Sequence, residues 1–349
     1  MALFSRRGKG DDTPAAPAAS ADDTGKDAAA STPATPVEPA PPAEPVPHVG
    51  ISVSTFGQGP ESARPVADAL ATGNAPAAEA TAPAATESMP GLPDNVLLRQ
   101  ALRALPADPQ PIHIMNVMRQ ALQGELYVRA QGDAQELLAA GKGLNLAIVT
   151  HADKRFLLVY SGGEPIQASV QAENGAPTPA LRQAAYNVLR TAIDSGYDGI
   201  SLDHASPGAR IVLPIELIKK ALEEAAPAPF ELKNLLASPR GDTTVAEVAD
   251  VLTRVPVWAA GNTGPDGRIG LAEARGGDGA EGVRRLEVYS HPLEVIAVGR
   301  GDGPLRLTPE QLARALASEP SLTGIVIDPA GPWIEVDRAA LAPVLALAD

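Results

Sequence analysis

Asp203 and Asp328 are the residues of this 349-residue chain that are best placed to do chemistry. Each follows a short apolar run, residues 199–202 and 324–327, at the point where a predicted strand must turn. One interpretation is that the two carboxylates contact a ligand or a metal at the ends of adjacent strands. The other is that each carboxylate accepts backbone N–H bonds and closes its turn, which Asn would do equally well. The second interpretation is favoured, and both stay open at this point.

Histidines are few and scattered, which limits the acid–base chemistry that the sequence predicts. His204 follows Asp203, while His151 and His291 fall in other predicted loops and turns. The chain has no cysteine, no His-Glu-x-x-His pair, no Gly-x-Ser-x-Gly elbow and no Walker A loop. We therefore expect no enzyme, no cofactor and no metal site. The alternative is a small-molecule binder or an enzyme whose site lies between two repeats and uses Asp203, His204, His151 or His291.

The chain has two tryptophans, Trp258 and Trp333. Trp258 stands in a predicted strand, where a core position is usual. Trp333 follows Gly331-Pro332 at a predicted turn, and an aromatic side chain presented by a turn is typical of an anchor for a protein partner. Trp333 is therefore a candidate partner-binding residue.

A second partner-binding candidate is the segment 50–57. Apolar and small polar residues alternate there, which predicts a strand that adds to a sheet edge, in this chain or in a partner. The apolar residues of this segment are Ile51, Val53 and Phe56.

The first 95 residues differ in composition from the rest of the chain. They hold 15 of the 35 prolines and neither Tyr nor Trp. Such a segment cannot bury enough apolar surface to offset the entropy of ordering it. The sequence therefore predicts that residues 1–95 are a disordered, acidic Pro- and Ala-rich tail, interrupted by the apolar segment 50–57.

The formal net charge of −14 argues against nucleic acid as a partner, because nucleic acid recruits proteins through clustered Lys and Arg. No stretch reaches the 18 or more apolar residues that would span a bilayer, and no signal peptide is recognisable at the N-terminus. We expect a cytoplasmic protein without membrane insertion, and we expect its partner to be another protein.

The sequence predicts the same order of strands and helices in each half of the chain, and these elements must position the residues above. Val159-Tyr160-Ser161 ends one predicted strand and Val288-Tyr289-Ser290 ends another, and in each half a Thr-Pro pair, at 178 or 308, opens a predicted helix. This order predicts an α+β fold with two tandem copies of a small mixed-sheet domain and flanking helices. The expected limits of the two domains are residues 96–226 and 227–349. A further helix is expected at 134–140.

The closing segments of the two halves resemble those of a known family. Residues 199–204 (Gly-Ile-Ser-Leu-Asp-His) and 324–329 (Gly-Ile-Val-Ile-Asp-Pro), with the strands that follow them, resemble the final strand-turn-strand-helix of bacterial SseB-family domains. The family pattern at this turn is Gly, three apolar residues, Asn and Pro. Here Asp replaces Asn in both copies, and His204 replaces Pro in the first.

The resemblance covers about residues 97–349, and the Ala-, Pro- and Asp-rich composition is similar to that of members from high-GC bacteria. It implies two tandem SseB N-terminal-type domains that act as a protein-interaction or regulatory module, with no assigned catalytic residues. The enterobacterial namesake of the family is associated with enhanced serine sensitivity. The resemblance therefore implies a class of protein and leaves the exact role open.

Overall fold

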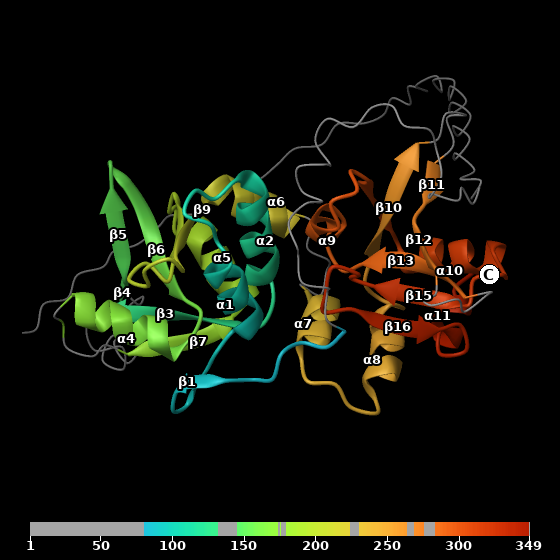
Figure 1. Cartoon of the computed structure of the whole chain (residues 1–349), viewed down its shortest axis with the longest axis horizontal. Helices are drawn as coiled ribbons and strands as arrows, with labels where there is room; N and C mark the ends of the chain where they lie inside the picture. The colour runs from blue at the N-terminus through green and yellow to red at the C-terminus, as the bar shows by residue number, and fades with distance from the viewer. Residues whose placement is uncertain are drawn as a thin grey trace, which may run out of the picture. The chain divides into compact units, whose positions relative to one another are not determined.

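The computed structural model describes residues 80–131, 145–173, 175, 179–223, 230–263, 269–275 and 283–348. The segment 50–57, the helix expected at 134–140 and the connector between the two halves, 224–229, lie outside these residues. The described part is α+β, as predicted, with two mixed sheets of seven strands each and helices packed against them (Figure 1).

The first sheet has the strand order β4-β3-β6-β8-β9, with β5 paired to β6 and β7 paired to β3. Strands β6 and β8 run parallel, and the other neighbours run antiparallel. We call the part from α1 to α6 the first repeat. Its elements are α1 (Val96–Arg103), α2 (Pro111–Ala121), β3 (Glu125–Gln131), β4 (Asn145–Leu146), β5 (Ile148–His151), β6 (Lys154–Tyr160), α4 (Gly163–Ala172), β7 (Ala180–Ala184), α5 (Ala185–Asp194), β8 (Gly199–Leu202), β9 (Ile211–Pro214) and α6 (Ile215–Glu223).

The second sheet repeats this topology, with the order β11-β10-β13-β15-β16, β12 paired to β13 and β14 paired to β10. We call the part from α7 to α11 the second repeat. Its elements are α7 (Glu231–Ala237), α8 (Thr244–Val251), β10 (Val257–Thr263), β11 (Ile269–Leu271), β12 (Glu273–Arg275), β13 (Arg284–Tyr289), α9 (Pro292–Ala297), β14 (Gly303–Leu307), α10 (Pro309–Ser318), β15 (Gly324–Ile327), β16 (Ile334–Asp337) and α11 (Ala342–Leu345). The two sheets therefore share one strand order.

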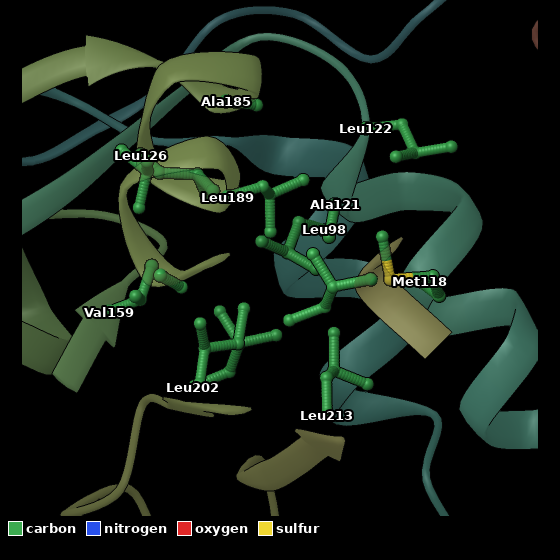
Figure 2. Packing of buried hydrophobic residues seen from close by; sticks show 14 of the residues in the cluster. Leu98, Met118, Ala121, Leu122, Leu126, Val159, Ala185, Leu189, Leu202 and Leu213 are labelled. Carbon is green, nitrogen blue, oxygen red and sulfur yellow. The ribbon is translucent and has the colours of Figure 1, made fainter. Parts of the chain in front are cut away.

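Each repeat buries its own apolar core between its helices and one face of its sheet. In the first repeat, Leu98 of α1, Met118 of α2, Leu189 of α5 and Leu202 of β8 are fully buried and point toward one another (Figure 2). The second repeat forms a separate cluster from equivalent elements. Trp258 is buried in β10, as its strand position predicts. None of the helices within the described ranges is both long enough and apolar enough to cross a lipid bilayer.

Gly199 and Gly324 begin the central strands β8 and β15, where no side chain fits. A Cβ atom would lie 2.3 Å from the carbonyl oxygen of Leu213 at the first position and 2.2 Å from that of Val336 at the second. These contacts are far inside van der Waals distance, so the antiparallel partner strand can approach only a glycine. The two glycines therefore mark the same position in the two repeats.

The helix expected from Thr178 begins later than predicted. Residues 180–184 form β7, which pairs with β3, and α5 begins at Ala185. The apolar residues have helical spacing, but residues 180–184 pair with the edge of β3 instead of forming helix. Strand pairing in the folded protein overrides the local helical propensity here. In the second repeat, Thr308 caps α10 with its side chain, as expected. The position equivalent to Thr308 is thus Ala184, which directly precedes α5.

Ordered structure begins before the limit expected from composition. Residues 87–89 (β1) and 92–93 (β2) form a small hairpin within the segment 1–95 that was predicted to be disordered. The hairpin is held by hydrogen bonds from Ser88 and Thr86 to Asp94, which a count of prolines does not reveal. The segment 1–95 therefore ends in a short ordered hairpin that its composition did not predict.

Candidate functional site

Asp203 and Asp328 occupy the same turn in the two repeats and make the same contacts. Both residues have a left-handed backbone, with φ of 47° and 51°, a conformation that Asp and Asn tolerate better than most residues. One carboxylate oxygen of each accepts a 2.8 Å hydrogen bond from the backbone N–H of a serine, Ser161 or Ser290, and the other accepts from the hydroxyl of that serine. Each aspartate thus ties the ends of two parallel strands together, rather than bonding within its own turn.

The two buried aspartates have raised pKa values. Burial raises the pKa of Asp203 to about 6, although the hydrogen bonds from Ser161 oppose the rise. Burial also raises the pKa of Asp328, and the negative charge of Glu294 adds to this effect. Both carboxyl groups therefore take up a proton at a higher pH than an exposed aspartate does.

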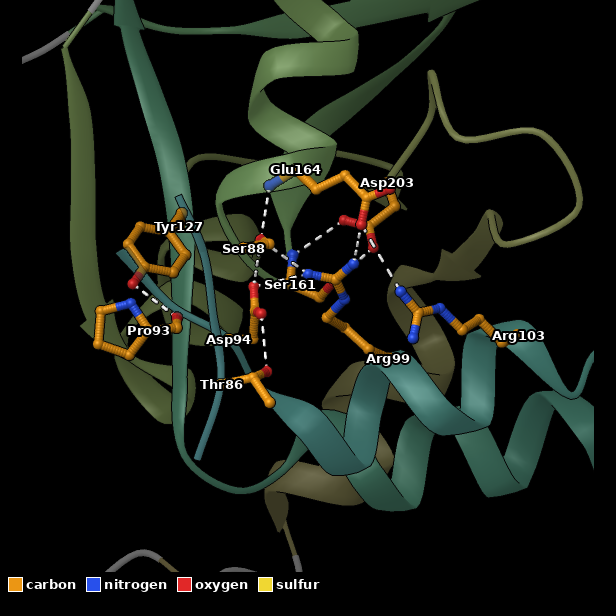
Figure 3. A network of polar contacts seen from close by, with 10 residues as sticks. All are labelled: Thr86, Ser88, Pro93, Asp94, Arg99, Arg103, Tyr127, Ser161, Glu164 and Asp203. Atoms are coloured by element: carbon orange, nitrogen blue, oxygen red, sulfur yellow. Dashed lines mark hydrogen bonds and ion pairs between the residues drawn. The ribbon is translucent and has the colours of Figure 1, made fainter. Parts of the chain in front are cut away.

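Arg99 lies at the centre of a polar cluster in the first repeat (Figure 3). Its Nη1 donates to Asp94 Oδ1 at 2.6 Å and to Ser88 Oγ at 2.9 Å, and its Nη2 binds Glu164 in the first turn of α4. Burial would raise the pKa of Asp94, but hydrogen bonds from Ser88, Thr86 and Arg99 lower it below its usual value. The cluster therefore joins α1, α4 and the β1–β2 hairpin by charge-assisted bonds.

Lys233 takes the place of Arg99 in the second repeat. Each of these cations directly follows a buried leucine of its helix. Each also binds an acidic residue in the first turn of another helix, the one that begins just after the repeated Tyr-Ser pair. In the second repeat this acid is Glu294 of α9, and its Oε2 also accepts a 2.7 Å bond from Arg119. Arg119 belongs to α2 of the first repeat, so the cluster of the second repeat is completed by the first.

The acids Glu164 and Glu294 differ in exposure, because only one of them is covered. The side chain of Glu294 is 1% exposed and that of Glu164 is 63% exposed. Burial would raise the pKa of Glu294, but Arg119 and Lys233 hold it below its usual value. The equivalent cluster in the first repeat has no such cover from a helix among the described residues.

Beside Glu164 lies a surface hollow of about 270 Å³ between α1, α4 and the turn that follows β8. We call it the α1–α4 hollow. The side chain of Arg103 stands at its rim, 62% exposed, with Nη2 3.6 Å from Glu164 Oε2. The charged residues of its lining are Arg99, Arg103, Glu164 and Asp203, and its apolar wall includes Leu102, Pro165 and Ala168. The hollow therefore opens directly onto the aspartate turn and the arginine cluster.

His291 lies between the two repeats and is fully engaged. Its Nε2 lies 3.0 Å from the carbonyl oxygen of Ala221, and its Nδ1 accepts a 3.2 Å bond from the N–H of Leu293. The rings of Phe230 and Trp258 pack against it, with centroids 6.0 and 5.9 Å away. Burial lowers the pKa of His291 to about 4, although the bond to Ala221 opposes the fall. The ring is therefore neutral near pH 7 and contributes to the contact between the repeats.

The residues that a site between the repeats would use lie apart from one another. His204 packs edge-on to the ring of Tyr160, and its Nε2 is 4.0 Å from Glu173. His151 is exposed at the end of β5. Of the group Asp203, His204, His151 and His291, the lining of the α1–α4 hollow includes Asp203 alone. The described part of the chain does not gather them in one pocket.

The structure describes only one of the candidate partner-binding residues. Trp333 is half-buried in the turn between β15 and β16. Ile51, Val53 and Phe56 lie outside the described residues. Both proposals for partner contact therefore remain predictions.

Sequence reasoning missed the residues around the aspartates. Helices α4 and α9 were not expected, and they carry Glu164 and Glu294. A signal for them is present, because an acidic residue stands three or four positions after the repeated Tyr-Ser pair, in the first turn of a helix. Nothing local in the sequence indicates that Arg119 meets Glu294.

Comparison with known proteins gives one match. Residues 98–220, about a third of the chain, match the family model described as the SseB protein N-terminal domain. This segment runs from α1 to α6, so the first repeat is similar to that domain, and the resemblance is confirmed for this repeat. No curated protein and no solved structure matches the chain significantly.

Proposed function

We propose that this protein is a non-catalytic, SseB-like binding module, and that a protein partner binds at the α1–α4 hollow of the first repeat. In this proposal the second repeat is a second copy of the same domain, and the two domains fall near the limits 96–226 and 227–349. The cytoplasmic location expected from the sequence is part of the proposal. Regulation would follow from which partner occupies the hollow.

The contrast between Glu164 and Glu294 carries the proposal. In the second repeat, the surface formed by Lys233, Glu294 and the turn after Asp328 receives α2 of the first repeat. The corresponding surface of the first repeat has a cation, an acid and an aspartate turn in equivalent positions, yet Glu164 is exposed there. We therefore take the exposed copy as the better candidate for contact with another protein.

A small-molecule binder is the second candidate. A hollow of about 340 Å³, within the size range of ligand pockets, lies between the segment that precedes α1 and the end of α7. Its charged lining consists of Asp94 and Glu125, and Asp94 is already bound by Arg99. This lining would suit a small polar or cationic molecule.

Site-specific crosslinking in cells tests the proposed function. A photoreactive residue at position 167, on the exposed side of α4, would lie beside the hollow, and one at position 195, at the end of α5, would serve as the control. We expect a defined protein adduct from position 167 and none from position 195. Equal labelling from both positions, or no adduct from position 167, would contradict the proposal. Ser238 lines the hollow of about 340 Å³, so copurification of a metabolite that is lost on substitution of Ser238 would favour the second candidate.

A further inference from the structure

We infer that the partner at the α1–α4 hollow presents an amphipathic helix whose arginine binds Glu164 and the carbonyl oxygen of Ser206. This inference rests on the proposed function and names the chemistry of the partner. It is carried by the way in which α2 covers the second repeat.

The contact between α2 and α9 shows what such a helix provides. Arg119 Nη1 donates to Glu294 Oε2 at 2.7 Å and reaches the carbonyl oxygen of Gly331 at 3.4 Å. Asn116, one turn earlier in α2, accepts a 3.2 Å bond from Arg119 Nε and so orients the guanidinium group. Leu293 of α9 packs against the apolar core of the first repeat. The contact thus combines one buried, oriented arginine with the apolar packing of Leu293.

The first repeat offers a comparable pair of acceptors, a glutamate in the first turn of α4 and a backbone carbonyl three residues after the aspartate. The N–H of Ser206 donates to the carbonyl oxygen of Asp203 at 2.8 Å, and the N–H of Gly331 donates to that of Asp328 at 2.7 Å, so the two turns begin with the same hydrogen bond. Ser206 lines the α1–α4 hollow and is the third residue after its aspartate, as Gly331 is in the second repeat. Its carbonyl oxygen accepts from Ala209 at 3.2 Å and has a second lone pair for a donor.

The apolar contribution of a helix also has a counterpart in the hollow. Leu102, Pro165 and Ala168 form a wall beside Glu164, from α1 and α4. Apolar side chains on either side of the incoming arginine would pack there and exclude water from the ion pair, which strengthens it.

Arg103 provides a weakly bound partner for Glu164 while the hollow is unoccupied. Its guanidinium is 3.6 Å from Glu164 and is mostly exposed, and such surface pairs contribute only about 0–1 kcal/mol. An incoming arginine can therefore displace it at little cost. Arg103 is the last residue of α1, and the last residue of α7 is Ala237, so the covered repeat carries no such competing cation there. The net charge of −14 would further favour the approach of a cationic helix.

The probe for this inference is a peptide with the sequence of residues 109–123, which includes α2 and Arg119. Because the chain has no cysteine, Ala168→Cys in the full chain can be labelled uniquely with a trifluoromethyl group and observed by fluorine NMR. We expect a saturable shift of this signal as the peptide is added. The peptide variant Arg119→Gln and the chain variant Glu164→Gln should each weaken binding by about tenfold or more. Glu216→Gln, which removes another exposed acid, on α6, should leave binding unchanged.

Two results would overturn the inference. One is the absence of a shift at about 1 mM peptide, which is the weak end of specific affinity. The other is equal binding of the Arg119→Gln peptide, or tighter binding of an Arg119→Glu peptide, which would indicate an apolar or acidic partner instead.

A protein adduct from position 167 combined with no peptide binding would refute the helix and retain the proposed function. If no adduct forms, the proposed function itself fails. A signal that shifts with protein concentration alone would mean that a second copy of the chain fills the hollow.

Discussion

Arg119 of the first repeat and Glu294 of the second form an ion pair of 2.7 Å in which both side chains are more than nine-tenths buried. The two residues are 175 positions apart in the sequence. A buried carboxylate is tolerated only when cations and hydrogen bonds replace the water that it loses, and Lys233 provides the second cation. The second repeat therefore depends on the first for the neutralisation of its own buried charge.

Removal of Arg119 should destabilise the protein far more than removal of Arg103. Arg119→Met leaves Glu294 buried with a single cation, and we expect a loss of about 3 kcal/mol or more in the free energy of unfolding. Arg103→Met breaks only an exposed pair and should cost less than about 1 kcal/mol. Denaturant unfolding measures both values. The double variant Arg119→Met with Glu294→Gln should regain part of the loss, and equal losses for the two single variants would contradict this account.

Asp203→Asn should change how stability depends on pH. Because the pKa of Asp203 is about 6 in the folded protein and its ordinary value is 3.8, folding favours the protonated carboxyl. This contribution to stability is fully present below about pH 4 and is lost as the pH rises through about 6. Asn can accept the bond from the Ser161 N–H with its Oδ1 and donate from its Nδ2 to the Ser161 Oγ, and it carries no charge. The variant should thus gain stability relative to the wild type between pH 4 and pH 7, by at most about 3 kcal/mol.

The measurement is chemical denaturation of both proteins at several pH values in this range. Asp194→Asn is the control, since Asp194 is exposed at the end of α5. A constant difference between Asp203→Asn and the wild type across the range would show that the carboxyl of Asp203 has an ordinary pKa.

Gly324→Ala should destabilise the second repeat through one steric contact. The added Cβ would lie 2.2 Å from the carbonyl oxygen of Val336, so β15 and β16 must separate. We expect a loss of about 1–3 kcal/mol or more, as for overpacked sites. Gly241→Ala meets nothing within 4 Å and should change stability by less than about 0.5 kcal/mol. Thermal unfolding of the two variants side by side tests the prediction, which fails if both behave like the wild type.

Trp333→Ala tests whether the turn between β15 and β16 is a second contact with a partner. If the half-buried indole is an anchor, the substitution should cost about 2 kcal/mol of partner affinity, a loss of tens of fold, and should leave the fold intact. Affinity capture with the wild type, with Trp333→Ala and with a chain lacking residues 1–79 separates this turn from the segment 50–57. The deletion ends at 79 because Ser88 and Asp94 bind Arg99. Equal recovery of the same partners by all three proteins would exclude both segments.

The sequence contains enough information for the fold class and for the aspartate turns. The repeated Tyr-Ser pair, with Gly199 and Gly324, marks equivalent strands, because an apolar run and a sterically required glycine are local features. The start of α5 at Ala185 was not predictable in this way. Its boundary is set by the pairing of β7 with β3, about 55 residues earlier in the chain, and helical spacing does not report such pairing.

The candidate site was predicted only at its centre. Asp203 and Asp328 could be identified because each ends a recognisable strand, but their serine partners lie on the neighbouring parallel strands. Glu164 and Glu294 lie on helices α4 and α9, which were not expected. The difference between them arises from Arg119, whose partner is chosen by tertiary contact. Two nearly equal local patterns therefore yield one covered surface and one open one, and only the structure distinguishes them.

The placement of α2 on α9 makes an association between domains intramolecular. A helix tethered to its own target has an effective concentration that reaches the millimolar range when the link is short and flexible. An external competitor must therefore be present at a comparably high concentration to displace it. No helix of the described residues covers the α1–α4 hollow of the first repeat in this way. Two similar surfaces of one chain can therefore differ in how readily they bind an external partner. The surface around Glu294 is occupied by α2, whereas the surface around Glu164 would respond to a dilute ligand. This difference needs no difference in the intrinsic affinity of the two surfaces.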